Sequence, residues 1–263
     1  MKPRVACIPK RQKNDRPSRA DTVHLFAAGS LEGALTDIAN TYEAVTGNKV
    51  EAKYGPSGLL KNEISQGGNA DVFASANMEH PQALRDEKKS GPIIRFARNK
   101  LCALVRPGLP VDAEGLLDRM IDRSVKLGTS TPNVDPSGDY AFEVFRRAEL
   151  IKPGAQAALE QKALKLTGGA SSAKPPPDRT VYGWHVAAGH ADIFLTYCTN
   201  ALVAQKENPA QQIVQLPSNL AVGADYGLTV INGSTYAAQQ LADFILSPEG
   251  QKILMKYGFT PGK

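Results

Sequence analysis

Apolar and polar residues recur along the chain with two different periods. Short apolar runs typical of strands stand at VHLFAA (23–28), KVEAKYG (49–55) and ADVFASA (70–76). Helical segments begin between these runs at Ser30 and Ser57, and the first continues through 31–45 with apolar residues three and four positions apart until Gly47 stops it. This β/α alternation predicts a mostly parallel sheet covered by helices.

A second unit of similar size follows an apolar strand at 100–108. Its predicted elements are a strand at 125–132, a helix through 140–148, a Gly/Pro-rich loop at 167–178, a helix at 179–189 and a strand at 191–197. A strand at 226–232 and two helices close the chain, the last opened by Ser247 as cap and Pro248 at its first position. The expected fold is α/β and two-lobed, each lobe a mostly parallel sheet flanked by helices, with two crossover segments.

We expect this organisation to divide the chain into four parts. These are a disordered basic tail at 1–21, the first part of lobe 1 at 22–105, lobe 2 at 106–218 and a return to lobe 1 at 219–263. In open α/β sheets, ligands bind outside the carboxyl ends of the strands, so a ligand is expected between the lobes.

The net positive charge adds little to this picture, because it is concentrated in the first twenty residues. The formal charge is +5, but residues 1–20 hold seven Lys or Arg against one Asp, so they carry +6 and the remainder −1. A nucleic-acid partner is therefore not expected for the folded body. The tail lacks the apolar stretch of a secretory signal, and we expect it to be a mis-assigned start or a remnant upstream of the mature protein. No apolar window is long enough for membrane insertion.

The residue types that usually carry metal or covalent chemistry are sparse. Cys7, Cys102 and Cys198 are too scattered for a disulfide framework, and at positions 102 and 198 we expect two buried thiols rather than a bridge or a nucleophile. The four histidines show no metal spacing, because 185 and 190 are expected on different faces of a helix. Without a nucleophile elbow, a phosphate loop or a dinucleotide glycine pattern, neither an enzyme nor a cofactor is expected.

A serine stands at a strand-to-helix turn in three places. They are AAGSL with Ser30, YGPSGLL with Ser57 and DPSGDYA with Ser137. Each hydroxyl lies where the first amides of a helix lack internal partners, so plain N-capping is one interpretation. The other is that the three turns meet at one sheet edge and form an anion site of neutral donors, to which the helix dipoles contribute.

A tyrosine stands at the end of a strand in the second unit. Tyr197 closes ADIFLTY and would put a phenol at the same edge from lobe 2, or else be a core tyrosine bonded to backbone. Tyr182 and Trp184 are expected to be core or rim residues.

These segments together resemble a known family. AAGSL, YGPSGLL followed by ADVFASA, DPSGDYA and GHADIFLTYCTNA match, in order, segments of the bacterial molybdate-binding proteins of ABC transporters, which have a type II periplasmic-binding fold. The ending FILSPEGQKILMKYGF is also similar, although many binding proteins share it. The likeness covers about 22–260.

The resemblance implies a role for each matching position. Ser30 and Ser57 would donate hydroxyl and amide hydrogens, Ser137 an amide and Tyr197 its phenol. A further amide would fall near Arg179, whose side chain would either reach the anion or point to solvent. No direct cation ligand is implied, because molybdate would be bound through its oxygens.

The expected function is a periplasmic, monomeric receptor that captures a tetrahedral oxyanion, molybdate or tungstate, for the permease of an ABC importer. Cavity size would select against sulfate, since a smaller ion would stretch its hydrogen bonds to fixed donors. Two alternatives stay open: a binding protein for sulfate, thiosulfate or phosphate, and a cytoplasmic oxyanion sensor whose basic tail contacts nucleic acid or a regulator.

Overall fold

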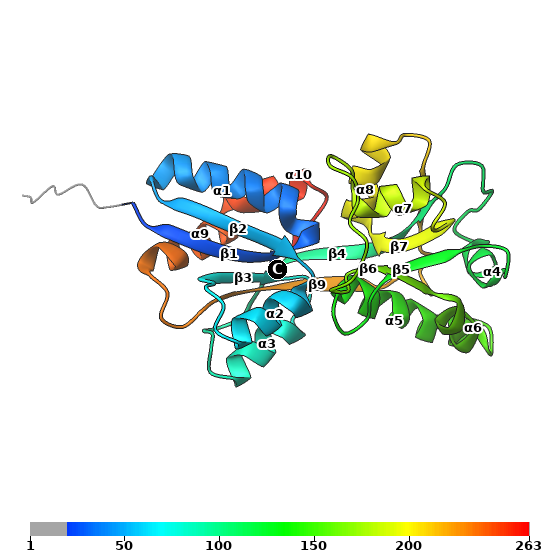
Figure 1. Cartoon of the computed structure of the whole chain (residues 1–263), viewed down its shortest axis with the longest axis horizontal. Coiled ribbons are helices and arrows are strands. Elements are labelled where there is room, and N and C mark those ends of the chain that lie inside the picture. Colours follow the sequence, from blue (N-terminus) through cyan, green and yellow to red (C-terminus); the bar gives the residue numbers. More distant parts are fainter. Residues whose placement is uncertain (1–19, 263) are drawn as a thin grey trace, which may run out of the picture.

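The computed structural model describes residues 20–262, which form two lobes side by side (Figure 1). Lobe 1 contains β1 (Thr22–Ala28), the 3-10 turn η1 (Gly29–Leu31), α1 (Glu32–Thr46), β2 (Lys49–Gly55), α2 (Ser57–Ser65), β3 (Val72–Ser75), α3 (Glu79–Asp86), α9 (Tyr236–Leu246), α10 (Pro248–Lys256) and β10 (Thr260–Pro261). Lobe 2 contains α4 (Leu116–Ile121), β5 (Leu127–Ser130), α5 (Pro136–Ile151), α6 (Ala155–Lys162), β6 (Leu164–Thr167), α7 (Val181–Ala187), β7 (Ile193–Tyr197), α8 (Cys198–Glu207) and β8 (Gln212–Gln215). The strands β4 (Ile94–Val105) and β9 (Gly223–Val230) run between the lobes. The predicted tail lies outside the described residues apart from Ala20 and Asp21.

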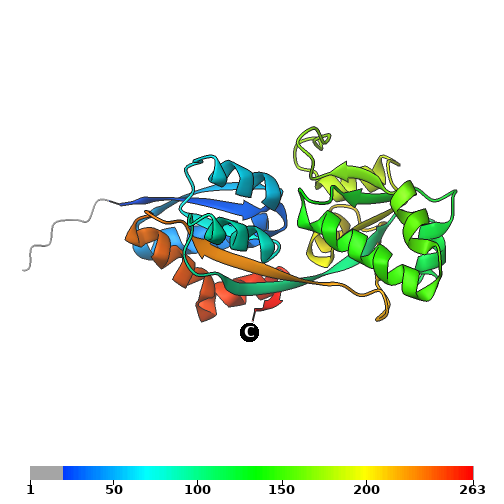
Figure 2. The same ribbon diagram turned by 90° about the horizontal axis from the view of Figure 1, so that it is seen from below.

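Each lobe has parallel strands at its centre. In lobe 1, β1 pairs parallel with both β2 and β3, and β9 pairs antiparallel with β3. In lobe 2, β5 pairs parallel with β6 and β7. Helices flank both sheets (Figures 1 and 2). The predicted two-lobed α/β fold is therefore confirmed, whereas the predicted residue limits of the lobes stay a prediction.

The long strand β4 connects the two sheets. It pairs antiparallel with β9 through Lys100, and from Leu101 onward it pairs with β7 and β8 instead. Seen from below, β4 and β9 cross together from one lobe to the other (Figure 2). These two strands bring the beginning of β9 and the end of β7 close to the boundary between the lobes.

Local sequence signals account for the helices that lead to this boundary. In α1, Ala34, Leu35 and Ile38 form part of the buried face, and Gly47 ends the helix with a φ of 79°, a left-handed conformation that glycine adopts without strain. In α10, the Ser247 hydroxyl accepts a hydrogen bond from the Gly250 amide and Pro248 takes the first position. Both helices were predicted and are confirmed. No helix within 20–262 is long and apolar enough to cross a membrane.

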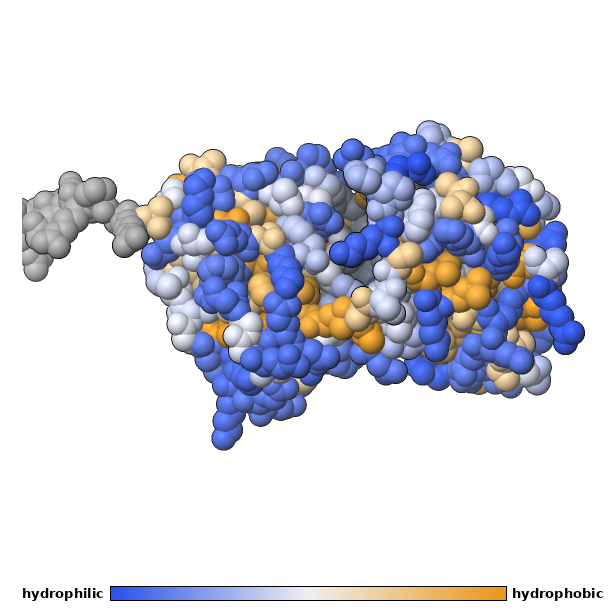
Figure 3. Space-filling model, viewed as in Figure 1, coloured by the Kyte–Doolittle hydropathy of each residue, from blue (hydrophilic) through white to orange (hydrophobic). Residues whose placement is uncertain are grey.

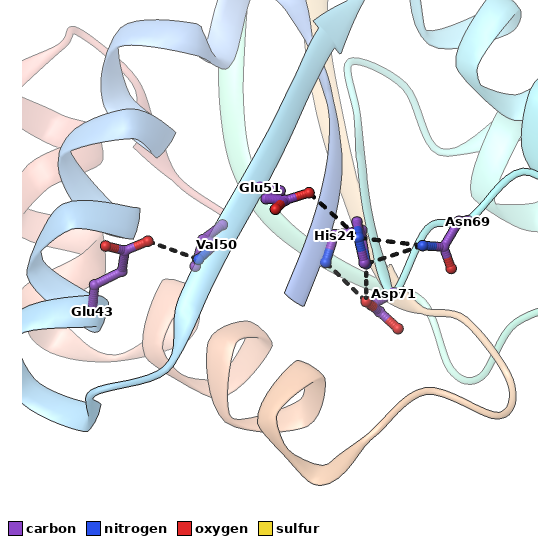
Figure 4. A network of polar contacts seen from close by, with 6 residues as sticks. All are labelled: His24, Glu43, Val50, Glu51, Asn69 and Asp71. Carbon is purple, nitrogen blue, oxygen red and sulfur yellow. Dashed lines mark hydrogen bonds and ion pairs between the residues drawn. The ribbon is translucent and has the colours of Figure 1, made fainter. Parts of the chain in front are cut away.

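A polar network holds the first strand in place at the edge far from this boundary. The His24 amide donates to Asp71 Oδ2 at 2.8 Å, and the ring nitrogen Nδ1 lies 3.0 Å from the same oxygen (Figure 4). Glu51 lies on the other side, with Oε2 3.6 Å from His24 Nε2. His24 of β1 thus contacts Glu51 of β2 and Asp71, just before β3. These contacts favour the observed register of β1 between its two neighbours, which places Gly29 and Ser30 at the opposite edge of the sheet.

The two cysteines within the described residues form a disulfide. Cys102 lies in β4 and Cys198 opens α8, and their sulfurs are bonded although 96 residues separate them in sequence. The expectation of two buried thiols is therefore wrong. The physical reason is the antiparallel pairing of β4 with β7, which sets Cys102 opposite Thr196 and so brings residue 198 within reach.

Candidate functional site: an anion site between the lobes

Ser30 meets a tyrosine of the crossover strand. Its Oγ lies 2.9 Å from the hydroxyl of Tyr226, and the Asn99 side-chain amide donates to that hydroxyl at 3.2 Å. Tyr226 stands near the beginning of β9, and β9 is antiparallel to β3. The first residues of β9 therefore lie at the carboxyl ends of the parallel strands, where the sequence predicts the site.

Ser57 and Tyr197 reach the same place from different lobes. Ser57 opens α2 and is 1% exposed; its Oγ accepts a hydrogen bond from the Ala76 amide at 3.1 Å, so its own hydrogen remains to be donated. The carbonyl of Ala76 faces the Tyr197 hydroxyl at 3.4 Å, and the Tyr197 and Tyr226 ring centroids are 5.6 Å apart. A continuous set of contacts thus joins Ser30, Ser57 and Tyr197.

None of the three serines caps its helix through its side chain. The turn that contains Ser30 and the helix that begins at Ser57 have no side-chain cap, and α5 is capped by Asp135, whose Oδ1 accepts from the Ser137 amide at 3.1 Å. The Ser137 hydroxyl is buried and has no hydrogen-bond partner within the described part of the chain. The N-capping interpretation is therefore wrong at all three positions.

The lobes touch directly beside Ser57. The Gly58 amide in the first turn of α2 donates to the carbonyl of Val134, just before α5, at 2.9 Å. A Cβ atom on Gly58 would lie 2.5 Å from that carbonyl oxygen, so only glycine allows this approach. This hydrogen bond therefore brings the two lobes together beside Ser57.

Burial keeps the phenols of this site neutral. Loss of solvent raises the pKa of Tyr197 well above its ordinary value, and neighbouring Tyr226 raises it further. Burial also raises the pKa of Tyr226, although its hydrogen bonds with Ser30 and Asn99 oppose the shift. Both hydroxyls hence keep their protons near neutral pH and can donate to an anion.

A cavity of about 480 Å³ adjoins these donors. It is lined by Met78, Glu79, Arg98, Asn99, Tyr140, Gly223, Ala224 and Asp225. Asn99 also contacts Tyr226, and the Tyr140 ring packs 6.2 Å from that of Tyr197. A recess between the lobes is visible in the space-filling view (Figure 3).

Arg179 is not joined to this group. Its Nε lies 3.8 Å from Glu207 Oε2, and its side chain is 42% exposed. The adjacent amide, that of Thr180, donates to the same carboxylate at 3.0 Å. Glu207 ends the ten-residue helix α8, which starts directly after Tyr197, so about 15 Å of helix separates the two positions.

The imidazoles of His185 and His190 meet, with their Nδ1 atoms 3.0 Å apart. The expectation that they lie on different helix faces is wrong, because α7 ends at Ala187 and the chain turns back before His190. No group of three or more His, Cys, Asp or Glu side chains within 20–262 is arranged to hold a metal ion. Tyr182 and Trp184 pack against neighbouring rings, as expected of core or rim residues.

Three residues that touch the site were missed in the sequence. Tyr226 and Asn99 stand on the crossover strands, and Asp135 directly precedes the turn with Ser137. For Asp135 a signal existed, because an acidic residue before Pro at a helix start is a common cap. The other two depend on the pairing of β4 with β9, which local patterns do not reveal.

Two lobes joined by crossover strands, with neutral donors meeting where they close, define the class of two-lobed ligand-capturing proteins. The chain belongs to the family of bacterial extracellular solute-binding proteins, whose model matches residues 23–260. Members of this family are solute-binding components of ABC transporters, located in the periplasm or outside the cell, and the family is one of transport proteins rather than enzymes.

Known proteins of this kind resemble the chain over most of its length. It is 32% identical to the uncharacterized protein PM1146 of Pasteurella multocida over 91% of this chain and 98% of that one. It is 25% identical to the molybdate-binding protein ModA of Azotobacter vinelandii, covering 92% and 91%. The sulfate-binding protein SubI of Mycobacterium tuberculosis shares the fold, with a TM-score of 0.72 at 18% identity over 92% and 87%. The predicted likeness to molybdate-binding proteins is confirmed.

Proposed function

We propose that this protein captures a tetrahedral oxyanion, with molybdate and tungstate preferred, and delivers it to the permease of an ABC importer. One observation carries the proposal: the hydroxyls of Ser30, Ser57 and Tyr197, with that of Tyr226, meet between the closed lobes. Such groups match a fully ionised anion, because they donate hydrogen bonds without adding a counter-charge. The similarity to ModA supports molybdate among the possible oxyanions.

The site residues of this proposal are Ser30, Ser57, Ser137 and Tyr197, to which the geometry adds Tyr226. In the closed protein, Ser30 and Tyr226 bond each other. Ligand binding would exchange this internal bond for bonds to charged oxygens, which each contribute about 1.5 kcal/mol or more. A direct role for Arg179 is not part of the proposal, because Glu207 already faces its guanidinium.

We place the protein in the periplasm. The disulfide between Cys102 and Cys198 supports this placement, because such bonds persist in oxidising compartments and are rare in the cytosol. The same bond weighs against the alternative of a cytoplasmic oxyanion sensor.

Calorimetry with a panel of oxyanions tests the ligand. Molybdate and tungstate should bind at least about a hundredfold more tightly than sulfate or phosphate, since a smaller ion would make longer hydrogen bonds to the fixed donors. Equal affinities would defeat the preference for molybdate, and a preference for sulfate would establish the alternative anion.

A pair of variants tests the site itself. Ser30→Ala combined with Ser57→Ala should remove the thermal shift that molybdate produces while the ligand-free protein stays folded. Ser65→Ala is the matched control, because Ser65 ends the same helix α2 and its buried hydroxyl has no hydrogen-bond partner within the described residues. Retention of the full shift by the double variant would exclude these serines.

A further inference from the structure

A carboxylate accepts the hydrogen bond of one of the amides that the family likeness assigns to the ligand. Asp135 lies at the start of α5, and its Oδ1 accepts a hydrogen bond from the Ser137 amide at 3.1 Å. A helix N-terminus attracts negative charge, and a capping carboxylate satisfies this attraction in the same way as a bound anion. Asp135 and an oxyanion therefore compete for the first turn of α5.

The surroundings of Asp135 offer it no cation. Asp139 on α5 adds a like charge, while Tyr182 on α7 and Tyr197 on β7 are the nearby phenols. The loop after β6 packs directly on it, because a Cβ atom on Gly168 would lie 2.6 Å from that of Asp135. Asp135 makes no ion pair within residues 20–262. Burial is the main cause that raises the pKa of Asp135 to about 6.

An ionised Asp135 would oppose a second anion at this place. Its carboxyl accepts the amide of Ser137, one of the predicted donors, and its charge acts on the buried phenol of Tyr197, another of them. Two negative charges at short range in a poorly solvated site repel each other strongly. A protonated carboxyl does not repel the ligand, and its O–H can donate to an oxyanion oxygen.

We propose that Asp135 takes up one proton when the oxyanion binds, which makes this residue a determinant of affinity and couples ligand capture to pH. The inference rests on the proposed function. The carboxylate and one proton from solvent give a neutral carboxyl, and no other covalent bond forms or breaks when the oxyanion binds.

The direction of the pH dependence follows from the two protonation states. The ligand-free carboxyl titrates at about 6, and the bound anion raises that pKa. Between the two values, binding takes up a proton, so affinity increases about tenfold for each pH unit that the pH falls. Below about pH 6 the free carboxyl is already protonated, and the affinity becomes constant.

Calorimetry of molybdate binding from about pH 6 to about pH 8, in two buffers of different ionisation enthalpy, measures the protons taken up. Uptake by the wild type should approach one proton per molybdate at about pH 7.5. Asp135→Asn keeps a capping oxygen but cannot ionise, so it should show no uptake, a flat pH profile and tighter binding at the upper end. Asp118→Asn, an exposed position on α4 whose carboxylate pairs with Lys152, is the control and should behave like the wild type.

Molybdate binding without proton uptake, or an Asp135→Asn variant that keeps the pH slope, overturns the role of Asp135 and leaves the receptor function intact. Failure of molybdate to bind at any pH overturns the proposed ligand, and this inference with it. Asp135→Ser provides a second neutral cap that must give the same flat profile.

Discussion

The hydroxyl of Tyr197 makes only a long hydrogen bond within the described part of the protein. Its hydroxyl is buried, yet it faces the Ala76 carbonyl at 3.4 Å, which is long for a hydrogen bond between these groups. Tyr42, by contrast, donates to the Ala237 carbonyl at 2.9 Å within lobe 1. The hydroxyl of Tyr197 hence lacks a good hydrogen bond where an anion is expected. The hydroxyl of Tyr42 has one in the core.

Tyr197→Phe should weaken molybdate binding about tenfold, because one charge-assisted hydrogen bond contributes about 1.5 kcal/mol. The free energy of unfolding of the ligand-free protein should change by less than about 1 kcal/mol, since only a long bond is lost. Calorimetry and urea denaturation measure the two quantities. Tyr42→Phe is the matched control and should do the opposite, lowering stability while leaving affinity unchanged. An unaltered affinity in Tyr197→Phe would exclude its hydroxyl from the site.

The site could be predicted at residue level only where the signal is local. Ser30 and Ser57 follow strands and precede helices, so their place at one sheet edge follows from β/α alternation. Tyr226 cannot be placed in this way, because it stands at the beginning of its strand. It reaches the site only because β9 runs antiparallel to β3, a pairing between residues more than 150 positions apart.

At the scale of elements, β4 and α8 are joined covalently next to the site. Cys102 is fully buried in β4, and Cys198 directly follows Tyr197. The bond therefore ties the beginning of α8 to the crossover strand. The elements themselves were predictable from apolar periodicity, but the bond was not, because it requires the register of β4 on β7.

Loss of this disulfide should lower the free energy of unfolding by about 3 to 5 kcal/mol, the range expected for a closed loop of nearly a hundred residues. Urea denaturation of Cys102→Ala combined with Cys198→Ala measures the loss. Wild-type protein in reductant should show a similar loss, whereas the double variant should not respond to reductant. A wild-type protein whose stability is indifferent to reductant would show that the bond does not form.

At the scale of the whole molecule, a backbone hydrogen bond next to Ser57 joins the two lobes. The Gly58 amide donates to Val134, and Ser57 beside it is one of the proposed ligand donors, so the proposed binding and the contact between the lobes involve the same turn of α2. The two lobes were predictable from the repeated β/α pattern. This contact was not, because a glycine in a helical turn carries no sign of the partner that approaches it.

The variant Gly58→Ala should prevent the close approach of the lobes without lowering the stability of lobe 1. Alanine favours a helix over glycine by about 1 kcal/mol, so α2 should not be weakened. Its methyl group would nonetheless lie 2.5 Å from the Val134 carbonyl oxygen and hold the lobes apart. We expect molybdate affinity to fall by about tenfold or more, since closure brings the lobe 2 donors to the anion.

Small-angle X-ray scattering with molybdate present should show a larger radius of gyration for Gly58→Ala than for the wild type, and denaturation should show equal or higher stability. Gly91→Ala is the control, because a Cβ atom there would meet only the Val230 carbonyl at an ordinary 3.7 Å. If Gly58→Ala bound molybdate as tightly as the wild type with the same radius of gyration, close approach at this glycine would not be needed for capture. The Ser57 turn would then act on the ligand independently of the contact with Val134.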